Sequence, residues 1–91
     1  MHTLDDNPSM DNKLYDVREA FGEFAANPSE LHAGMAANAV DAYVEARGAP
    51  PPLDTVDHHR LDAMRRSTSA KVQEALARIL QRLQERSAIA A

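Results

Sequence analysis

Cysteine is absent from this 91-residue sequence, and glycine and aromatic residues are scarce. The lack of cysteine excludes a disulfide framework, a metal centre with cysteine ligands, and a thiol nucleophile. The three glycines, Gly22, Gly34 and Gly48, form neither a dinucleotide-binding motif nor a Walker-type phosphate loop. No apolar run approaches the roughly 18 residues of a membrane span, and the N-terminal residues do not resemble a signal peptide. We therefore expect a cytoplasmic protein without a cofactor.

The length and the hydrophobic content of 44% are typical of one small domain. A chain of this size buries only about 60–65% of the surface that it exposes when unfolded. Its stability can therefore depend on a partner protein or on self-association. We expect residues 1–9 to form a disordered tail and residues 10–91 to form a single helical domain.

Opposite charges are separated between the two halves of the chain. Residues 1–55 carry three basic and ten acidic side chains, a net charge of −7, whereas residues 56–91 carry seven basic and four acidic ones, a net charge of +3. Unlike charges on helices that fold back on each other pair within a molecule more often than with a ligand. We expect the two halves to complement each other.

Apolar residues in the first third of the chain recur at intervals of four and three, which predicts an amphipathic helix over about residues 10–26. The residues of this seam are Met10, Leu14, Val17, Phe21 and Phe24. The phenylalanines are therefore expected in the core or at an interface. Acidic residues lie off the seam and predict a solvated outer face.

A second helix is predicted over residues 28–47. It starts within the segment Asn27-Pro28-Ser29-Glu30, which combines an N-cap oxygen, a proline in the first helical position and a glutamate three residues after the cap. Gly48 predicts its end in a left-handed residue. Its many alanines make it thin, which allows close packing between two neighbours. The proline-rich segment 49–53 is a stiff linker, because proline disfavours a helix and lacks an amide donor.

The strongest periodic pattern lies in the C-terminal third. Apolar residues from Leu61 to Leu83 repeat with an average spacing near 3.67, which predicts one long helix over residues 55–87, capped by Asp54 or Thr55. A kink or a new N-cap near Ser67 or Ser69 is the alternative. The predicted fold is thus all-α, a three-helix bundle or helical hairpin with a long C-terminal helix.

Acidic residues and histidines cluster near the start of this third helix. The residues are Asp54, Asp57, His58, His59 and Asp62, of which three follow an i, i+4 spacing that could hold a divalent metal. The cluster offers two or three ligands where a stable site needs four. Metal binding at His58 and His59 is therefore the least favoured hypothesis, and solvent-exposed histidines beside a capped helix start are the simpler interpretation.

Arginines on the C-terminal helix raise the question of nucleic-acid binding. The acidic total, the sequence pI of about 5.4 and the lack of aromatic residues after Tyr43 argue against it. Membrane-surface binding lacks aromatic anchors in the same helix. Nothing in the sequence indicates a nucleophile with a base, so we expect neither an enzyme nor a small-molecule binder.

Protein–protein interaction is the remaining class. We predict a non-enzymatic adaptor, assembly chaperone or regulatory subunit that docks on another protein, or on itself as a homodimer, through its coiled-coil-like C-terminal helix. The predicted docking residues are Leu76, Ile79, Leu80 and Leu83, with Arg78, Arg82 and Arg86 around them.

A secreted filament subunit is the alternative function. The length and the helix–turn–helix around Asn27-Pro28-Ser29 resemble the small needle and rod subunits of type III secretion systems. This chain departs from them in having Glu30-Leu31 where a second proline is common, and in ending in Ser87-Ala88-Ile89-Ala90-Ala91 rather than in a strongly apolar tail. The resemblance implies self-assembly into helical fibres.

Overall fold

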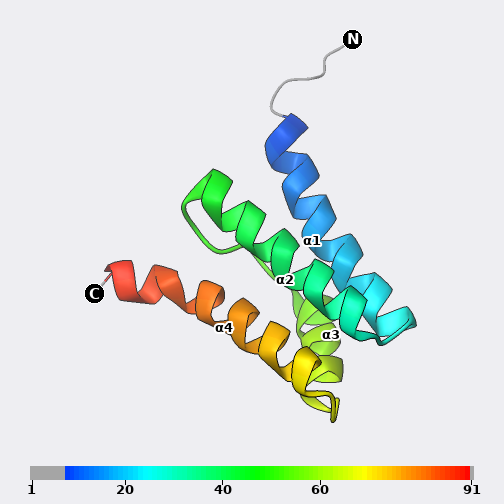
Figure 1. Ribbon diagram of the computed structural model, residues 1–91. Helices are drawn as coiled ribbons and strands as arrows, with labels where there is room; N and C mark the ends of the chain where they lie inside the picture. Colours follow the sequence, from blue (N-terminus) through cyan, green and yellow to red (C-terminus); the bar gives the residue numbers. More distant parts are fainter. Residues whose placement is uncertain (1–7, 91) are drawn as a thin grey trace.

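The computed structural model describes the backbone of residues 8–90 and the side chains of residues 12–84. Within these ranges the chain forms no strand and four helices: α1 (Pro8–Ala26), α2 (Glu30–Arg47), α3 (Thr55–Arg65) and α4 (Ala70–Ala90) (Figure 1). The all-α class is confirmed. The predicted three-helix layout is not, because residues 55–87 form two helices. Of the predicted tail, residues 8 and 9 belong to α1, and the remainder lies outside the described residues.

Helices α1 and α2 form an antiparallel hairpin around a short turn at residues 27–29 (Figure 1). The predicted N-cap was two residues early, because Ser29 caps α2: its side-chain oxygen accepts a hydrogen bond from the His32 amide at 3.1 Å. Pro28 therefore precedes the cap instead of starting the helix. At the other end Gly48 has φ 75° and donates its N–H to the Val44 carbonyl, as the sequence predicts.

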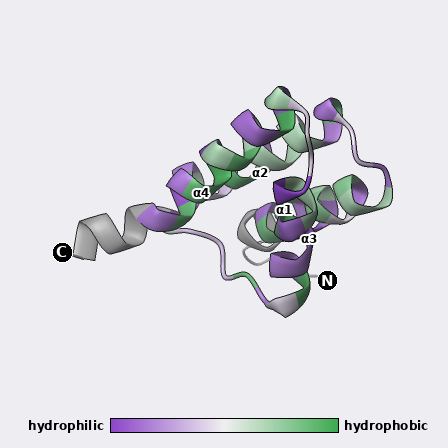
Figure 2. Ribbon diagram, turned by 90° about the horizontal axis from the view of Figure 1, so that it is seen from below, coloured by the Kyte–Doolittle hydropathy of each residue, from purple (hydrophilic) through white to green (hydrophobic). Residues whose placement is uncertain are grey.

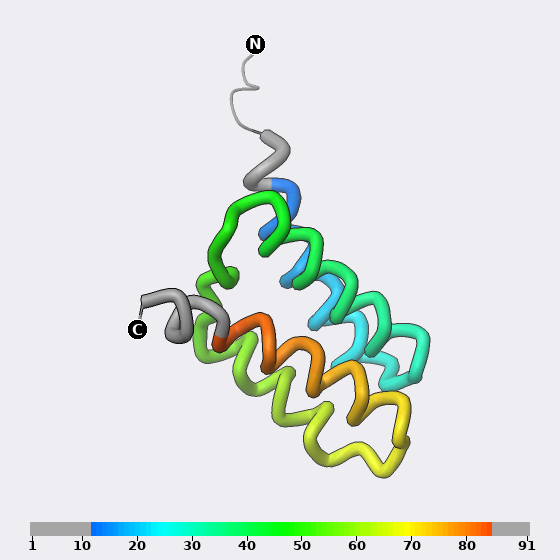
Figure 3. The backbone as a smooth tube through the Cα atoms, turned by 60° about the vertical axis from the view of Figure 1, so that its left-hand side comes forward, coloured from blue at the N-terminus to red at the C-terminus, as the bar shows by residue number. Residues whose placement is uncertain are grey.

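The chain turns sharply between α3 and α4, as the tube in Figure 3 shows. The side-chain amide of Gln73 donates to the carbonyls of Met64 and Ser67 at 2.9 and 2.7 Å, so it satisfies groups that the end of α3 leaves open. Ser69 accepts a 3.3 Å hydrogen bond from the Val72 amide and thereby caps α4. These local hydrogen bonds replace those of a continuous helix, which is why the predicted long helix is wrong.

One core joins all four helices. Helix α2 packs against α1 and α4, and α3 packs against the same two helices from another side (Figures 1 and 3). The thin helix α2 therefore has a neighbour on either side, as its alanine content predicts. The largest fully buried apolar side chains of the core come from all four helices and are Val17, Phe21, Phe24, Val40, Met64 and Ile79.

A buried carboxylate fixes the start of α3 against α1. Asp54 and Asp57 form a capping box, in which the amide of each donates to the carboxylate of the other at 3.1 and 2.9 Å. Arg18 of α1 lies 3.4 Å from the buried Asp57 carboxylate and donates to the Pro52 carbonyl in the linker. The proline-rich segment is thereby attached to the hairpin at a defined place.

Candidate protein-binding surface

Helix α2 is apolar on two opposite sides. Its inward side is buried and consists of Ala33, Ala36, Ala37, Val40, Tyr43 and Val44. Its outward side, here called the outer strip, consists of Leu31, Met35, Ala39, Ala42 and Ala46, which recur every three or four residues and so share one side. Leu31 is 70% exposed and Met35 is 44% exposed. Along α2 the ribbon in Figure 2 alternates between hydrophobic (green) and hydrophilic (purple) residues.

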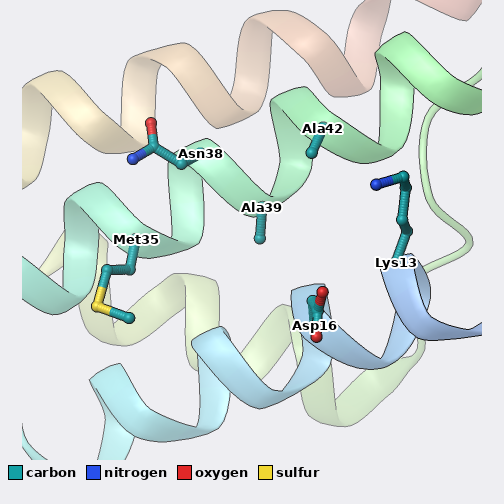
Figure 4. Close-up of a pocket in the computed structure, with 6 residues that line it drawn as sticks. All are labelled: Lys13, Asp16, Met35, Asn38, Ala39 and Ala42. Carbon is teal, nitrogen blue, oxygen red and sulfur yellow. The ribbon is translucent and has the colours of Figure 1, made fainter. Parts of the chain in front are cut away.

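A shallow, largely apolar hollow of about 300 Å³ lies beside the outer strip, between α2 and α1. Figure 4 shows Met35 at one end and Ala39 and Ala42 along one wall, with Lys13 of α1 extending up from the other wall, on which Asp16 also lies. The alanine side chains leave this space because a methyl group cannot reach α1. The hollow is open to solvent and could receive an apolar side chain from another helix.

The predicted docking residues of the C-terminal helix have intramolecular neighbours. Leu76 and Ile79 are buried in the core, and Leu80 and Leu83 are half-buried against it. Burial makes the first two structural, so a partner could reach only Leu80 and Leu83 while the fold persists. The side chain of Arg86 lies outside the described residues. Docking through this helix stays a prediction.

The arginines of α4 bind carboxylates of α2. Arg78 and Arg82 both contact Asp41, Arg82 also reaches Glu45 at 2.7 Å, and Arg78 donates to the Asn38 side chain at 3.1 Å. Partial burial alone would raise the pKa of Asp41, but the hydrogen bonds and charges of the two arginines outweigh it and hold that pKa below its ordinary value. The charge asymmetry of the two halves is thus used in part within the molecule.

The cluster predicted as a weak metal site has other partners. Asp54 and Asp57 cap α3, and Asp62 forms an ion pair with Arg65 at 3.3 Å. His58 and His59 are both exposed. The hydrogen bond from the Asp57 amide holds the pKa of Asp54 below its ordinary value. Among the described residues, no group of three potential ligands is placed to hold a metal ion.

Comparisons with protein-family models, with curated proteins and with solved structures gave no significant match. Within the described part of the chain, no helix combines the length and the apolar character needed to cross a bilayer.

Sequence reasoning did not single out the outer strip as a surface. The available signal was that Leu31, Met35 and Ala42 lie on the opposite side of α2 from the buried residues, so that apolar residues occupy two sides of the helix. The apolar period of α4 was a stronger signal than that of α2. Such a period indicates a buried helix side, but it does not say whether the side packs on another protein or on another helix of the same chain.

Proposed function

We propose that this protein is a small, non-enzymatic helical module of the cytoplasm that binds another protein, either a different chain or a second copy of itself. Its role would be that of an adaptor, an assembly chaperone or a regulatory subunit. The observation that carries the proposal is the outer strip of α2, which exposes Leu31 and Met35 beside an apolar hollow. Contiguous exposed apolar surface beside a groove is typical of protein-binding sites.

The strip suits a helical partner better than an extended one. Its apolar positions recur along 16 residues of one helix side, from Leu31 to Ala46, which matches the repeat of an amphipathic helix laid alongside. The small alanines would allow the two backbones to approach closely. Leu31 and Met35 would supply the larger anchors.

Docking through the C-terminal helix is retained as a second possible contact of the same module. Leu80 and Leu83 are half-buried, and Arg78 and Arg82 lie beside them on α4, although both arginines also bind α2. The surface that remains there is smaller than the predicted one. We therefore rank it below the outer strip.

The rod-subunit alternative ranks lower as well. The resemblance rests on the turn at residues 27–29, and Ser29 there makes an N-cap that any helical hairpin can use. Concentration-dependent fibres in electron micrographs would reverse this order.

Site-specific photo-crosslinking in cells of the source organism tests the proposal. A photoreactive phenylalanine analogue would replace Leu31 in the outer strip or Leu83 in α4. The control position is Tyr15 on α1, which is 62% exposed. We expect a discrete protein adduct from position 31 and none from position 15. An adduct from position 83 alone would move docking to the C-terminal helix, and no adduct from either position would contradict the proposed function.

A further inference from the structure

We propose that the outer strip of α2 is a homodimer interface, in which α2 packs antiparallel against α2 of a second copy about a two-fold axis near Asn38 and Ala39. This inference rests on the proposed function and names the partner as the same chain. It follows from the order of large and small residues along the strip and from the charges beside it.

The strip is divided into a protruding half and a hollow half. Leu31 and Met35 protrude near the start of α2, whereas the hollow lies beside Ala39 and Ala42, and Ala46 continues the small half (Figure 4). A two-fold axis perpendicular to α2, passing between positions 38 and 39, places Met35 of one copy opposite Ala42 of the other. It also places Leu31 opposite Ala46. Each protrusion then meets a small residue, and the interface is isologous.

A parallel arrangement lacks this match. A two-fold axis along α2 would place Met35 opposite Met35 and Ala42 opposite Ala42, so that large residues collide where small ones leave a void. Both overpacking and voids oppose association. The antiparallel arrangement also opposes the dipoles of the two helices.

The charges beside the hollow are complementary in the same arrangement. Lys13 extends from α1 toward Ala42, and Asp16 lies on α1 below Ala39, so both residues line the hollow (Figure 4). An axis perpendicular to α2 keeps α1 of both copies on the same side of the interface. Along the direction of α2, Lys13 of each copy is then offset by only about one helical turn from Asp16 of the other. The hollow thus has a cation and an anion placed to pair across the axis.

Sedimentation equilibrium of the full chain, from micromolar to millimolar concentration, gives the first test. We expect a reversible monomer–dimer equilibrium that Met35→Glu weakens by at least about 100-fold in Kd, because the substitution enters a two-fold interface twice. Val56→Glu is the matched control, since Val56 is a 51% exposed aliphatic residue on α3, and it should leave the Kd unchanged. Circular dichroism of both variants should show wild-type helix content.

Cysteine crosslinking distinguishes the antiparallel from the parallel arrangement. Because the native chain has no cysteine, only the introduced cysteines can form disulfides. Chains with Met35→Cys and chains with Ala42→Cys would be mixed in equal amounts and oxidised gently. Random pairing of equal amounts gives about twice as much mixed 35–42 disulfide as either homodisulfide. We expect the mixed product to exceed that ratio clearly, because facing residues of closely packed helices satisfy disulfide geometry. Excess of 35–35 and 42–42 products would overturn the antiparallel arrangement.

A strict monomer throughout the concentration range, or a dimer that Met35→Glu leaves intact, would overturn the inference. Either result is separate from the fate of the proposed function. If the chain is monomeric but position 31 still forms an adduct with a different protein, the outer strip binds a foreign partner. If it is monomeric and no adduct forms at position 31 or 83, both proposals fail.

Discussion

On its inward side α2 buries alanine, valine and tyrosine against α1 and α4, whereas on its outward side it offers alanine, leucine and methionine to solvent. The two sides have similar chemistry and different surroundings. Burial of the inward side stabilises the monomer, while the outward side can gain the same kind of free energy only by association. Substitutions on the two sides should therefore affect different equilibria, namely folding and binding.

The largest loss of unfolding free energy should come from removing a large core side chain that packs against the inward side of α2. Phe21→Ala is expected to cost about 3–5 kcal/mol in the free energy of unfolding, because Phe21 is 2% exposed and its loss leaves a cavity. Urea denaturation followed by circular dichroism measures this. Tyr15→Ala on the same helix is the control and should stay within about 0.5 kcal/mol. Equal losses for the two variants would contradict the assignment of the core.

The corner between α3 and α4 should show the next largest effect, because it directs α4 onto the inward side of α2. Gln73→Glu keeps the shape of the side chain but removes the amide that donates to the Met64 and Ser67 carbonyls. We expect a loss of about 1–3 kcal/mol in unfolding free energy. Glu74→Gln, the neighbouring exposed position, makes the converse change and should be nearly neutral. An unchanged unfolding midpoint for Gln73→Glu would show that the corner does not depend on this amide.

Acid should weaken the contact between α2 and α4 by a smaller amount. The pKa of Asp41 is lower in the folded chain than its ordinary value of 3.8, so its ion pairs contribute full stability above that value and lose it as pH falls through the folded pKa. Because the pair is partly exposed, we expect about 1 kcal/mol or less. Unfolding free energies of the native chain and of Asp41→Asn, measured between pH 7 and about pH 2, should converge as the acid limit is reached. A constant difference at all pH values would contradict this account.

The smallest effect on folding should come from the outward side. Leu31→Gln replaces a 70% exposed residue with another good helix former, so the unfolding free energy of the monomer should change by no more than about 0.5 kcal/mol. The same substitution should weaken association in sedimentation experiments. A large loss of monomer stability would mean that Leu31 already has a partner within the chain.

Much of the fold could be predicted from local signals. The seam ending in Phe21 and Phe24, the left-handed Gly48 and the cap at Asp54 each depend on residues close in sequence, and each is present in the structure. The break before α4 also depends on local residues, but there the sequence is compatible with both one long helix and two helices. The apolar spacing is kept across the polar residues 66–69, and only the combined hydrogen bonds of Gln73 and Ser69 favour a turn over a continuous helix.

The candidate surface could be predicted only in part, because it depends on which helices become neighbours. The pattern of Leu76 and Ile79 indicated an apolar contact, and the structure places that contact within the chain, against the core. The separation of charge did indicate pairing between the halves, which Asp41 and Arg78 illustrate. No spacing in the sequence could say which side of α2 would remain open once α1 and α4 had packed.

The turn at residues 27–29 also bears on the order in which the helices assemble. It allows α1 and α2 to meet after closing a loop of three residues, whereas the ion pairs from α4 to Asp41 join residues 37 and 41 positions apart. Shorter loops lose less chain entropy on closure, so we expect the hairpin to form first and α4 to complete it. Phe21 should then have a higher φ-value in folding kinetics than Ile79.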